Sequence, residues 1–303
     1  MIIDAHQHVW DPERAAYDWL GPELAPIDRT FVFEESRDAL RRAGVTASVL
    51  VQAADNDEDT ELMLDTAARC PEVVGIVAYV PLDDAARSGE RLAQLRRSKH
   101  VVGVRNLIHN LADQDWLLRD DVDAGLTAVA RAGLAFDLVS VLPRHLEHAT
   151  TIARRHPGLR IVIDHLSKPP VGGDDREPWW SLIEQAAQNP LVYAKVSGLY
   201  GTVGGPGAWT TDGIRPFFDR ALEVFGPDRL MYGGDWPVSI AAGGYDRVWA
   251  ALSELIGELA PDERAAILSD TAYAFYRLDD SLLAAAAAAA NTSASPPASP
   301  PVE

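Results

Sequence analysis

An alternation of short apolar runs and longer helix-like segments constrains the fold of this chain more than any other feature. Eight apolar runs occur, and they read IIDAHQHVW, ASVLVQA, VVGIVAYVPL, VVGVRNLI, LAFDLVS, RIVIDHL, LVYAKVS and RLMYGGDWP. Segments with the composition of helices lie between them, at residues 33–43, 59–69, 85–97, 122–132, 144–155, 179–188 and 217–225. A strand followed by a helix, repeated around a closed sheet, is the pattern of a (β/α)8 TIM barrel. We therefore predict an α/β fold with a single barrel domain over residues 1–280.

A doubly wound open sheet is the alternative for a chain that alternates strands and helices. Such sheets usually have fewer strands, and those that bind dinucleotides carry a G-x-G-x-x-G motif after the first strand. No such motif follows the first apolar run. The glycine-rich stretch TVGGPG at residues 202–207 contains a proline and is predicted to be a loop. These features favour the barrel.

The C-terminal stretch differs in composition from the rest of the chain. Residues 284–290 are all alanine, and the sequence NTSASPPASPPVE follows them. This composition offers few side chains that could bury a core. We therefore predict that residues 281–303 form a frayed helix end and a disordered tail behind the barrel domain.

The net charge and the cysteine content limit the kinds of partner and the cellular compartment that we expect. The formal net charge of −18 argues against binding to nucleic acid and to anionic membrane surfaces. No apolar run approaches the ~18 residues of a membrane-spanning helix, and no basic stretch precedes an apolar segment as in a signal peptide. Cys70 is the only cysteine, so no intrachain disulfide can form. We therefore expect a cytoplasmic protein with a small-molecule partner.

Polar side chains occur near the ends of most of the predicted strands. In TIM barrels the chemistry takes place at the carboxyl ends of the strands. Strands also become polar simply where they meet loops, so for several of these residues both interpretations stay open. The residues are His6, His8, Gln52, Tyr79, Arg105, Asp137, His165, Lys195 and Asp235.

Two histidines one residue apart stand out at the start of the chain. Residues i and i+2 of a strand point to the same side, so His6 and His8 are expected to face the barrel axis together. A pair of neutral imidazoles on one face can ligate a metal ion. The spacing alone is weak evidence, and it gains weight because His165 and Asp235 end two later strands of the same predicted barrel.

The motifs that contain these residues resemble a known family. The segments IDAHQHVW, YDWL, GVRNLIH, FDLV, IDHLSKPP, KVSGL and YGGDWPVS occur in this order between residues 2 and 278. Together they resemble the lactonase branch of the amidohydrolase superfamily, which includes L-fuconolactonases, L-rhamnonolactonases and 2-pyrone-4,6-dicarboxylate lactonases. The resemblance implies a (β/α)8 barrel that hydrolyses the ester of a cyclic sugar acid or a related lactone.

The resemblance also bears on metal content. Many amidohydrolases hold two metal ions, bridged by a carboxylated lysine or a glutamate on the fourth strand, with a histidine on the fifth. Here the fourth strand ends in Arg105 and the fifth contains Asp137, so we expect at most one divalent ion, with Zn²⁺ the best match. Its ligands would be His6, His8 and Asp235, with His165 close by. Some lactonases of this branch are thought to work without a metal, so the need for one stays open.

Catalytic roles follow from the chemistry of lactone hydrolysis, which needs a nucleophilic water, a base, and a donor at the carbonyl oxygen. We predict that Asp235 is the base. His165 holds a metal ion or donates to the carbonyl oxygen. Arg105 and Lys195 stabilise the developing oxyanion or bind polar groups of the substrate. The alternative for these two cations is a structural ion pair inside the barrel.

Substrate contacts are predicted from residues near the mouth of the barrel. Trp10, Trp19 and Trp236 suit the apolar face of a sugar ring, with ordinary core packing as the alternative. His109 follows the fourth strand and is within reach of a substrate. Lys168 lies in the proline-stiffened SKPP segment and points either at a ligand or at solvent.

Two other functions compete with lactone hydrolysis. A metal-dependent decarboxylase of the same superfamily would use a similar set of histidines and an aspartate on an acidic aromatic substrate. A barrel that binds a ligand without catalysis is the second alternative, and the intact histidine and aspartate set counts against it.

Overall fold

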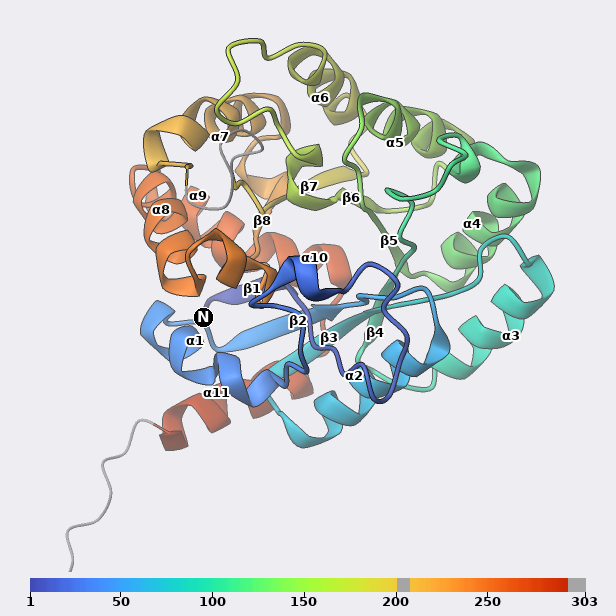
Figure 1. The fold of residues 1–303 in the computed structure, drawn as a ribbon, viewed down its shortest axis with the longest axis horizontal. Helices are drawn as coiled ribbons and strands as arrows, with labels where there is room; N and C mark the ends of the chain where they lie inside the picture. The colour runs from blue at the N-terminus through green and yellow to red at the C-terminus, as the bar shows by residue number, and fades with distance from the viewer. Residues whose placement is uncertain (201–207, 294–303) are drawn as a thin grey trace, which may run out of the picture.

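Eight parallel strands form one sheet in the computed structural model, which describes residues 1–200 and 208–293. Each strand pairs with the next along the chain, and a bridge between Gln7 and Trp236 brings the first and last strands together. The predicted (β/α)8 barrel is therefore confirmed (Figure 1). The strands are β1 Ile3–Gln7, β2 Ala47–Val51, β3 Val73–Ala78, β4 Val101–Arg105, β5 Ala135–Leu138, β6 Ile161–Ile163, β7 Val192–Val196 and β8 Leu230–Tyr232.

Helices follow the strands and surround them in Figure 1. Their ends match local signals in the sequence, because α1 and α4 stop at Gly44 and Gly133, which adopt the left-handed conformation with φ of 71° and 73°. The helices are α1 Arg37–Ala43, α2 Asp57–Arg69, α3 Ala85–Leu95, α4 Asp120–Ala132, α5 Pro143–Arg155, α6 Trp179–Ala187, α7 Thr211–Phe225, α8 Tyr245–Gly257, α9 Pro261–Ala265, α10 Thr271–Tyr276 and α11 Asp280–Ser293.

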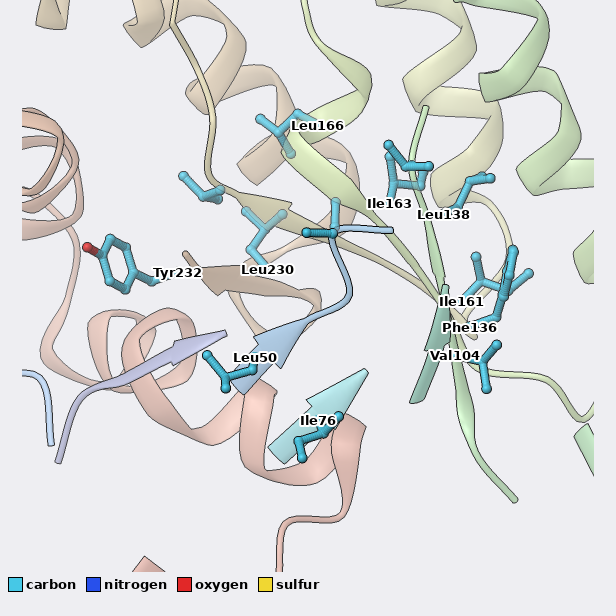
Figure 2. Close-up of a cluster of buried hydrophobic side chains, with 14 of the residues drawn as sticks. Leu50, Ile76, Val104, Phe136, Leu138, Ile161, Ile163, Leu166, Leu230 and Tyr232 are labelled. Carbon is cyan, nitrogen blue, oxygen red and sulfur yellow. The ribbon is translucent and has the colours of Figure 1, made fainter. Parts of the chain in front are cut away.

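The alternation of side chains along each strand produces two apolar layers. Leu50, Ile76 and Val104 belong to the layer between strands and helices, part of which is drawn in Figure 2. A second cluster fills the barrel interior, and Phe275 of α10 packs into it. The lower part of the interior is thus a packed apolar core, and the polar residues are left at the carboxyl ends of the strands.

The C-terminal stretch differs from its prediction. Asp280–Ser293 form helix α11, which packs against β2 and β3, and Leu283 and Ala286 are buried there. A helix end was predicted here, but the helix is ordered as far as Ser293, and the prediction that no side chain of this stretch is buried is wrong for Leu283 and Ala286. Alanine is the best helix former, and residues three apart fall on one helix face that can be buried. Residues 294–303, like the stretch at 202–207, lie outside the described residues.

No helix in the described part of the chain is both long enough and apolar enough to span a bilayer.

Candidate active site

A cavity of about 250 Å³ opens at the carboxyl ends of the strands, where the sequence predicted the chemistry. A further cavity of about 270 Å³ lies between α1 and α11 at the opposite end of the barrel, away from the polar strand ends. The first cavity is lined by His8, Trp10, Trp19, Ala53, Arg105, Leu107, His109, Val139, Val141, His165, Lys168, Asp235 and Val238.

His6, His8 and Asp235 form a tight cluster beside this cavity. The Nε2 atoms of His6 and His8 are 3.1 Å apart, and Asp235 Oδ1 lies 3.8 and 3.4 Å from them. His8 Nδ1 lies 2.7 Å from the carbonyl oxygen of Val51 and must donate to it, so Nε2 of the neutral ring carries a lone pair. At least two acceptor atoms, His8 Nε2 and Asp235 Oδ1, therefore face one another. Such a set fits a divalent cation.

Asp235 is held in place by its backbone and is ionised. Its amide donates to the carbonyl oxygen of His6 at 2.8 Å, and its φ of 52° lies in the left-handed region, which aspartate tolerates better than most residues. Burial acts to raise the pKa of Asp235, but the neighbouring His165, His8 and Lys168 outweigh it and lower the pKa to about 2. Oδ2 is buried and accepts no well-formed hydrogen bond from the described residues.

A left-handed turn follows β6 and carries two cavity residues. Residues 165–168 all have positive φ, between 48° and 61°, although none of them is glycine. Strain of this kind is typical of functional sites. His165 Nδ1 lies 2.9 Å from the hydroxyl of Ser197, and its ring centroid is 4.5 Å from that of His6. A Cβ at Gly198 would lie 2.4 Å from His165 Nδ1, so glycine is required there for the histidine to fit.

A buried network of charges lies beneath the cluster. Lys195 Nζ is 2.5 Å from Asp137 Oδ2, 3.0 Å from Asp164 Oδ1 and 3.0 Å from His6 Nδ1. Arg105 Nη1 donates to Asp164 Oδ2 at 2.8 Å, and its Nη2 donates to the carbonyl oxygen of Gln52. Burial, together with the nearby charge of Lys195, lowers the pKa of His6 well below its ordinary value. His6 is therefore neutral at neutral pH, as a metal ligand must be.

A model of the amidohydrolase family matches residues 3–278 of this barrel, nearly all of the described chain. The chain belongs to the amidohydrolase family. An L-fucono-1,5-lactonase from Burkholderia ambifaria is 36% identical to this amidohydrolase over 281 residues, which cover 91% of this chain and 96% of the relative.

Solved structures agree with this assignment. An amidohydrolase from Burkholderia multivorans, crystallised with bound zinc, superimposes with a TM-score of 0.84 at 28% identity and covers 92% of this chain and 100% of its own. A 2,6-dihydroxybenzoate decarboxylase from Rhizobium is only 14% identical, with a TM-score of 0.63, and covers 91% of this chain and 98% of its own. The decarboxylase therefore shares the fold alone.

The structure brings most of the residues predicted for this amidohydrolase to one cavity. His6 lies directly behind His8, within the cluster but not on the cavity wall. Lys195 and Trp236 do not line the cavity either: Lys195 is fully buried among carboxylates, and the ring of Trp236 packs 5.5 Å from that of Phe31. The predicted residues that line it are His8, Trp10, Trp19, Arg105, His109, His165 and Asp235.

Two residues matter more than the sequence indicated. Asp164 contacts both Arg105 and Lys195, but it was not selected from the sequence, because the motif IDHLSKPP drew attention to the adjacent His165. Lys168, for which a ligand and solvent were both open, lines the cavity. Both residues lie in the segment that directly follows β6, and this position at the carboxyl end of a barrel strand could have indicated that they belong to the site.

Proposed function

We propose that the protein hydrolyses a sugar-acid lactone of the L-fuconolactone or L-rhamnonolactone type and releases the free acid. The observation that carries this proposal is the ionised carboxylate of Asp235, placed beside the acceptor face of His8 at the wall of a small cavity. The 36% identity to an L-fucono-1,5-lactonase over nearly the full length of both chains supports it. A cavity of about 250 Å³ suits one small ring.

The reaction needs one proton relay. Asp235 takes a proton from water as the water oxygen attacks the carbonyl carbon, and the carbonyl π electrons move onto its oxygen. When the carbonyl reforms, the bond to the ring oxygen breaks, and the carboxylic acid of Asp235 returns its proton to the leaving alkoxide. The sum is lactone plus water giving the hydroxy acid, with Asp235 regenerated.

The cluster also suits one divalent metal ion. His6, His8 and Asp235 would hold it, and two features support this assignment: Asp235 Oδ2 has no well-formed hydrogen bond from the described residues, and the lone pairs of His8 Nε2 and Asp235 Oδ1 face one another. Zinc is the best match, and the related amidohydrolase from Burkholderia multivorans was crystallised with it. When bound, such an ion lowers the pKa of water and polarises an ester carbonyl. His165 is close to the cluster, although its Nδ1 contacts the Ser197 hydroxyl.

The aromatic and polar residues of the cavity wall bind the substrate in this proposal. Trp10 and Trp19 are fixed by hydrogen bonds of 2.7 Å from their indole nitrogens to backbone carbonyls, and each offers a rigid apolar face. Burial and the charge of Arg105 lower the pKa of His109 to about 4, so it meets a substrate hydroxyl as a neutral ring. Arg105 supplies a cation at the same wall. Lys195 and Trp236 support these groups from behind.

A panel of lactones tests this function. We expect acid release, followed with a pH indicator, from L-fucono- or L-rhamnono-lactone, and no CO₂ from 2,6-dihydroxybenzoate. Release of CO₂ from the aromatic acid, with no acid formed from any lactone, would instead identify a decarboxylase. Heat-inactivated protein corrects for the spontaneous opening of the lactones.

We further propose that the enzyme acts in the cytoplasm on this small molecule and binds no nucleic acid. The free, buried thiol of Cys70 suits a reducing compartment, and the net charge of −18 repels a polyanion.

A further inference from the structure

Attack on a lactone builds negative charge at a site that already contains one. The carboxylate of Asp235 is needed as the base, so the oxyanion that forms on the carbonyl oxygen requires a nearby cation or donor that the protein has not used elsewhere. Three cations lie close to the carboxyl ends of the strands: Arg105, Lys168 and Lys195. Their contacts differ, and this difference indicates which of them can serve.

Lys195 and Arg105 both form ion pairs with the carboxylate of Asp164. An ammonium group has three N–H donors, and that of Lys195 is surrounded within 3.0 Å by the carboxylates of Asp137 and Asp164 and by the ring of His6. Its side chain is fully buried beneath the cluster and does not reach the cavity. Arg105 reaches the cavity wall, but its Nη1 donates to the Asp164 carboxylate, which balances its charge, and its Nη2 donates to the Gln52 carbonyl; its Nε has no hydrogen-bond partner among the described residues.

Lys168 differs from these two cations in its contacts. It lines the cavity together with Asp235 and forms no ion pair with any residue in the ranges 1–200 and 208–293. Within those ranges Nζ has one hydrogen-bond acceptor, the carbonyl oxygen of Gly198, at a long 3.4 Å. The ring of Tyr200 lies 5.6 Å away and adds a weak attraction to the ammonium.

The backbone fixes Lys168 in this place. It is the last residue of the left-handed turn that begins at His165, with φ of 48°, and two prolines follow it. Such a turn is unfavourable for residues other than glycine, so it persists because the surrounding fold holds it. The same turn therefore brings His165 and Lys168 to one cavity, which Asp235, in the segment after β8, also lines.

We propose that Lys168 is a catalytic residue whose ammonium group donates a hydrogen bond to the carbonyl oxygen of the lactone and stabilises the oxyanion. The inference rests on the proposed lactone hydrolysis. No proton leaves Lys168: the electron pair moves onto the carbonyl oxygen during attack and returns when the ring C–O bond breaks, and the alkoxide takes its proton from Asp235.

Replacement of Lys168 tests the role, and the chain offers a matched control. The sequence has three lysines, and Lys99 is exposed at the far end of the barrel, paired with Asp279. Loss of one oxyanion donor typically costs about 10²–10³-fold in kcat. We expect that Lys168→Met and Lys168→Ala lower kcat on the preferred sugar lactone by about this factor with a smaller change in KM, whereas Lys99→Met retains the wild-type rate. Melting curves establish that each variant is folded.

Chemical rescue separates the donor role from a structural one. Added methylammonium should restore part of the kcat of Lys168→Ala, and tetramethylammonium, which has no N–H group, should not. Across primary ammonium ions of similar size, the rescue should depend only weakly on their acidity, because the ion donates a hydrogen bond and no proton is transferred.

Four outcomes would overturn the proposal: wild-type kcat in both folded Lys168 variants, a change in KM alone, no rescue of the folded alanine variant, or a rescue that rises steeply with ammonium acidity, as proton transfer requires. A wild-type protein that hydrolyses no lactone would refute the proposed function itself, which distinguishes the two failures.

Discussion

Replacing Asp235 with asparagine removes the proposed base while keeping the shape of the site. Asparagine tolerates the left-handed backbone at this position, where φ is 52°, as well as aspartate does. Its amide can still occupy the space 3.4 Å from His8 Nε2. The substitution therefore tests the chemistry of the carboxylate rather than the packing around it.

The substitution has two effects whose size can be worked out, one on kcat and one on the free energy of unfolding. Loss of a general base costs at least ~100-fold in kcat, which corresponds to about 2.7 kcal/mol of barrier. The second is stability. The pKa of Asp235 falls from 3.8 to about 2 in the folded protein, so ionisation contributes roughly 2 kcal/mol of stability. This contribution is complete above pH 3.8 and is lost as the pH falls through about 2. Asparagine mimics the protonated acid, so Asp235→Asn should lose it at neutral pH.

Steady-state hydrolysis and thermal melting measure both effects. At roughly 2–4 °C per kcal/mol for a large domain, we expect the melting temperature of Asp235→Asn to fall by less than about 10 °C. Asp65→Asn, which replaces an exposed aspartate on α2, should leave turnover unchanged. An Asp235→Asn enzyme that hydrolyses the best lactone at the wild-type rate would refute the assignment of the base.

Three further predictions concern the metal, pH and the C-terminal helix. Titration of metal-free protein with Zn²⁺ should find at most one tightly bound ion per chain. His8→Ala should weaken the affinity for Zn²⁺ by more than the ~10–100-fold that an outer-sphere partner contributes. Burial lowers the pKa of His6 and His8 below 6.5, so kcat/KM should stay level from pH 8 to 6.5 and fall only in more acidic buffer; an inflection at or above 6.5 would contradict this. Thermal melts should show that ending the chain at residue 279, which removes Leu283 from the core, costs roughly 2 kcal/mol, whereas ending it at Ser293 costs nothing measurable.

The barrel could be predicted because its pattern is local and repeated. In LAFDLVS the outward residues Phe136 and Leu138 alternate with inward ones, as a strand buried on both faces requires. The ends of the helices were harder to predict. Helix 217–225 was predicted to start after Pro216, but α7 begins at Thr211, where Thr210 accepts a hydrogen bond from the Gly213 amide and caps the helix. The packing of α11 could not be predicted, because the composition of an alanine run indicates a helix but does not reveal a surface on which it packs.

The cluster at the strand ends could be anticipated for a geometric reason. Once the sheet closes, β1 and β8 become neighbours, and residues that follow them must meet. His6, His8 and Asp235 do lie within 4.8 Å of one another. This inference needed only the order of the strands and the side on which each residue points, and both can be read from the sequence.

The different roles of the buried cations could not be predicted in this way. For Lys195 the sequence left both substrate binding and a structural ion pair open, and the structure shows the ion pair. Its partners Asp137 and Asp164 come from β5 and from the end of β6, and only the stagger of the sheet puts both carboxylates within 3.0 Å of its ammonium. Lys168 depends on a left-handed turn of non-glycine residues, which backbone propensities predict against. A buried cation with its acceptors in place stabilises the site, whereas one whose donors face a cavity can bind the charge that develops there. The contacts of each lysine, rather than its position on a strand, therefore decide its role.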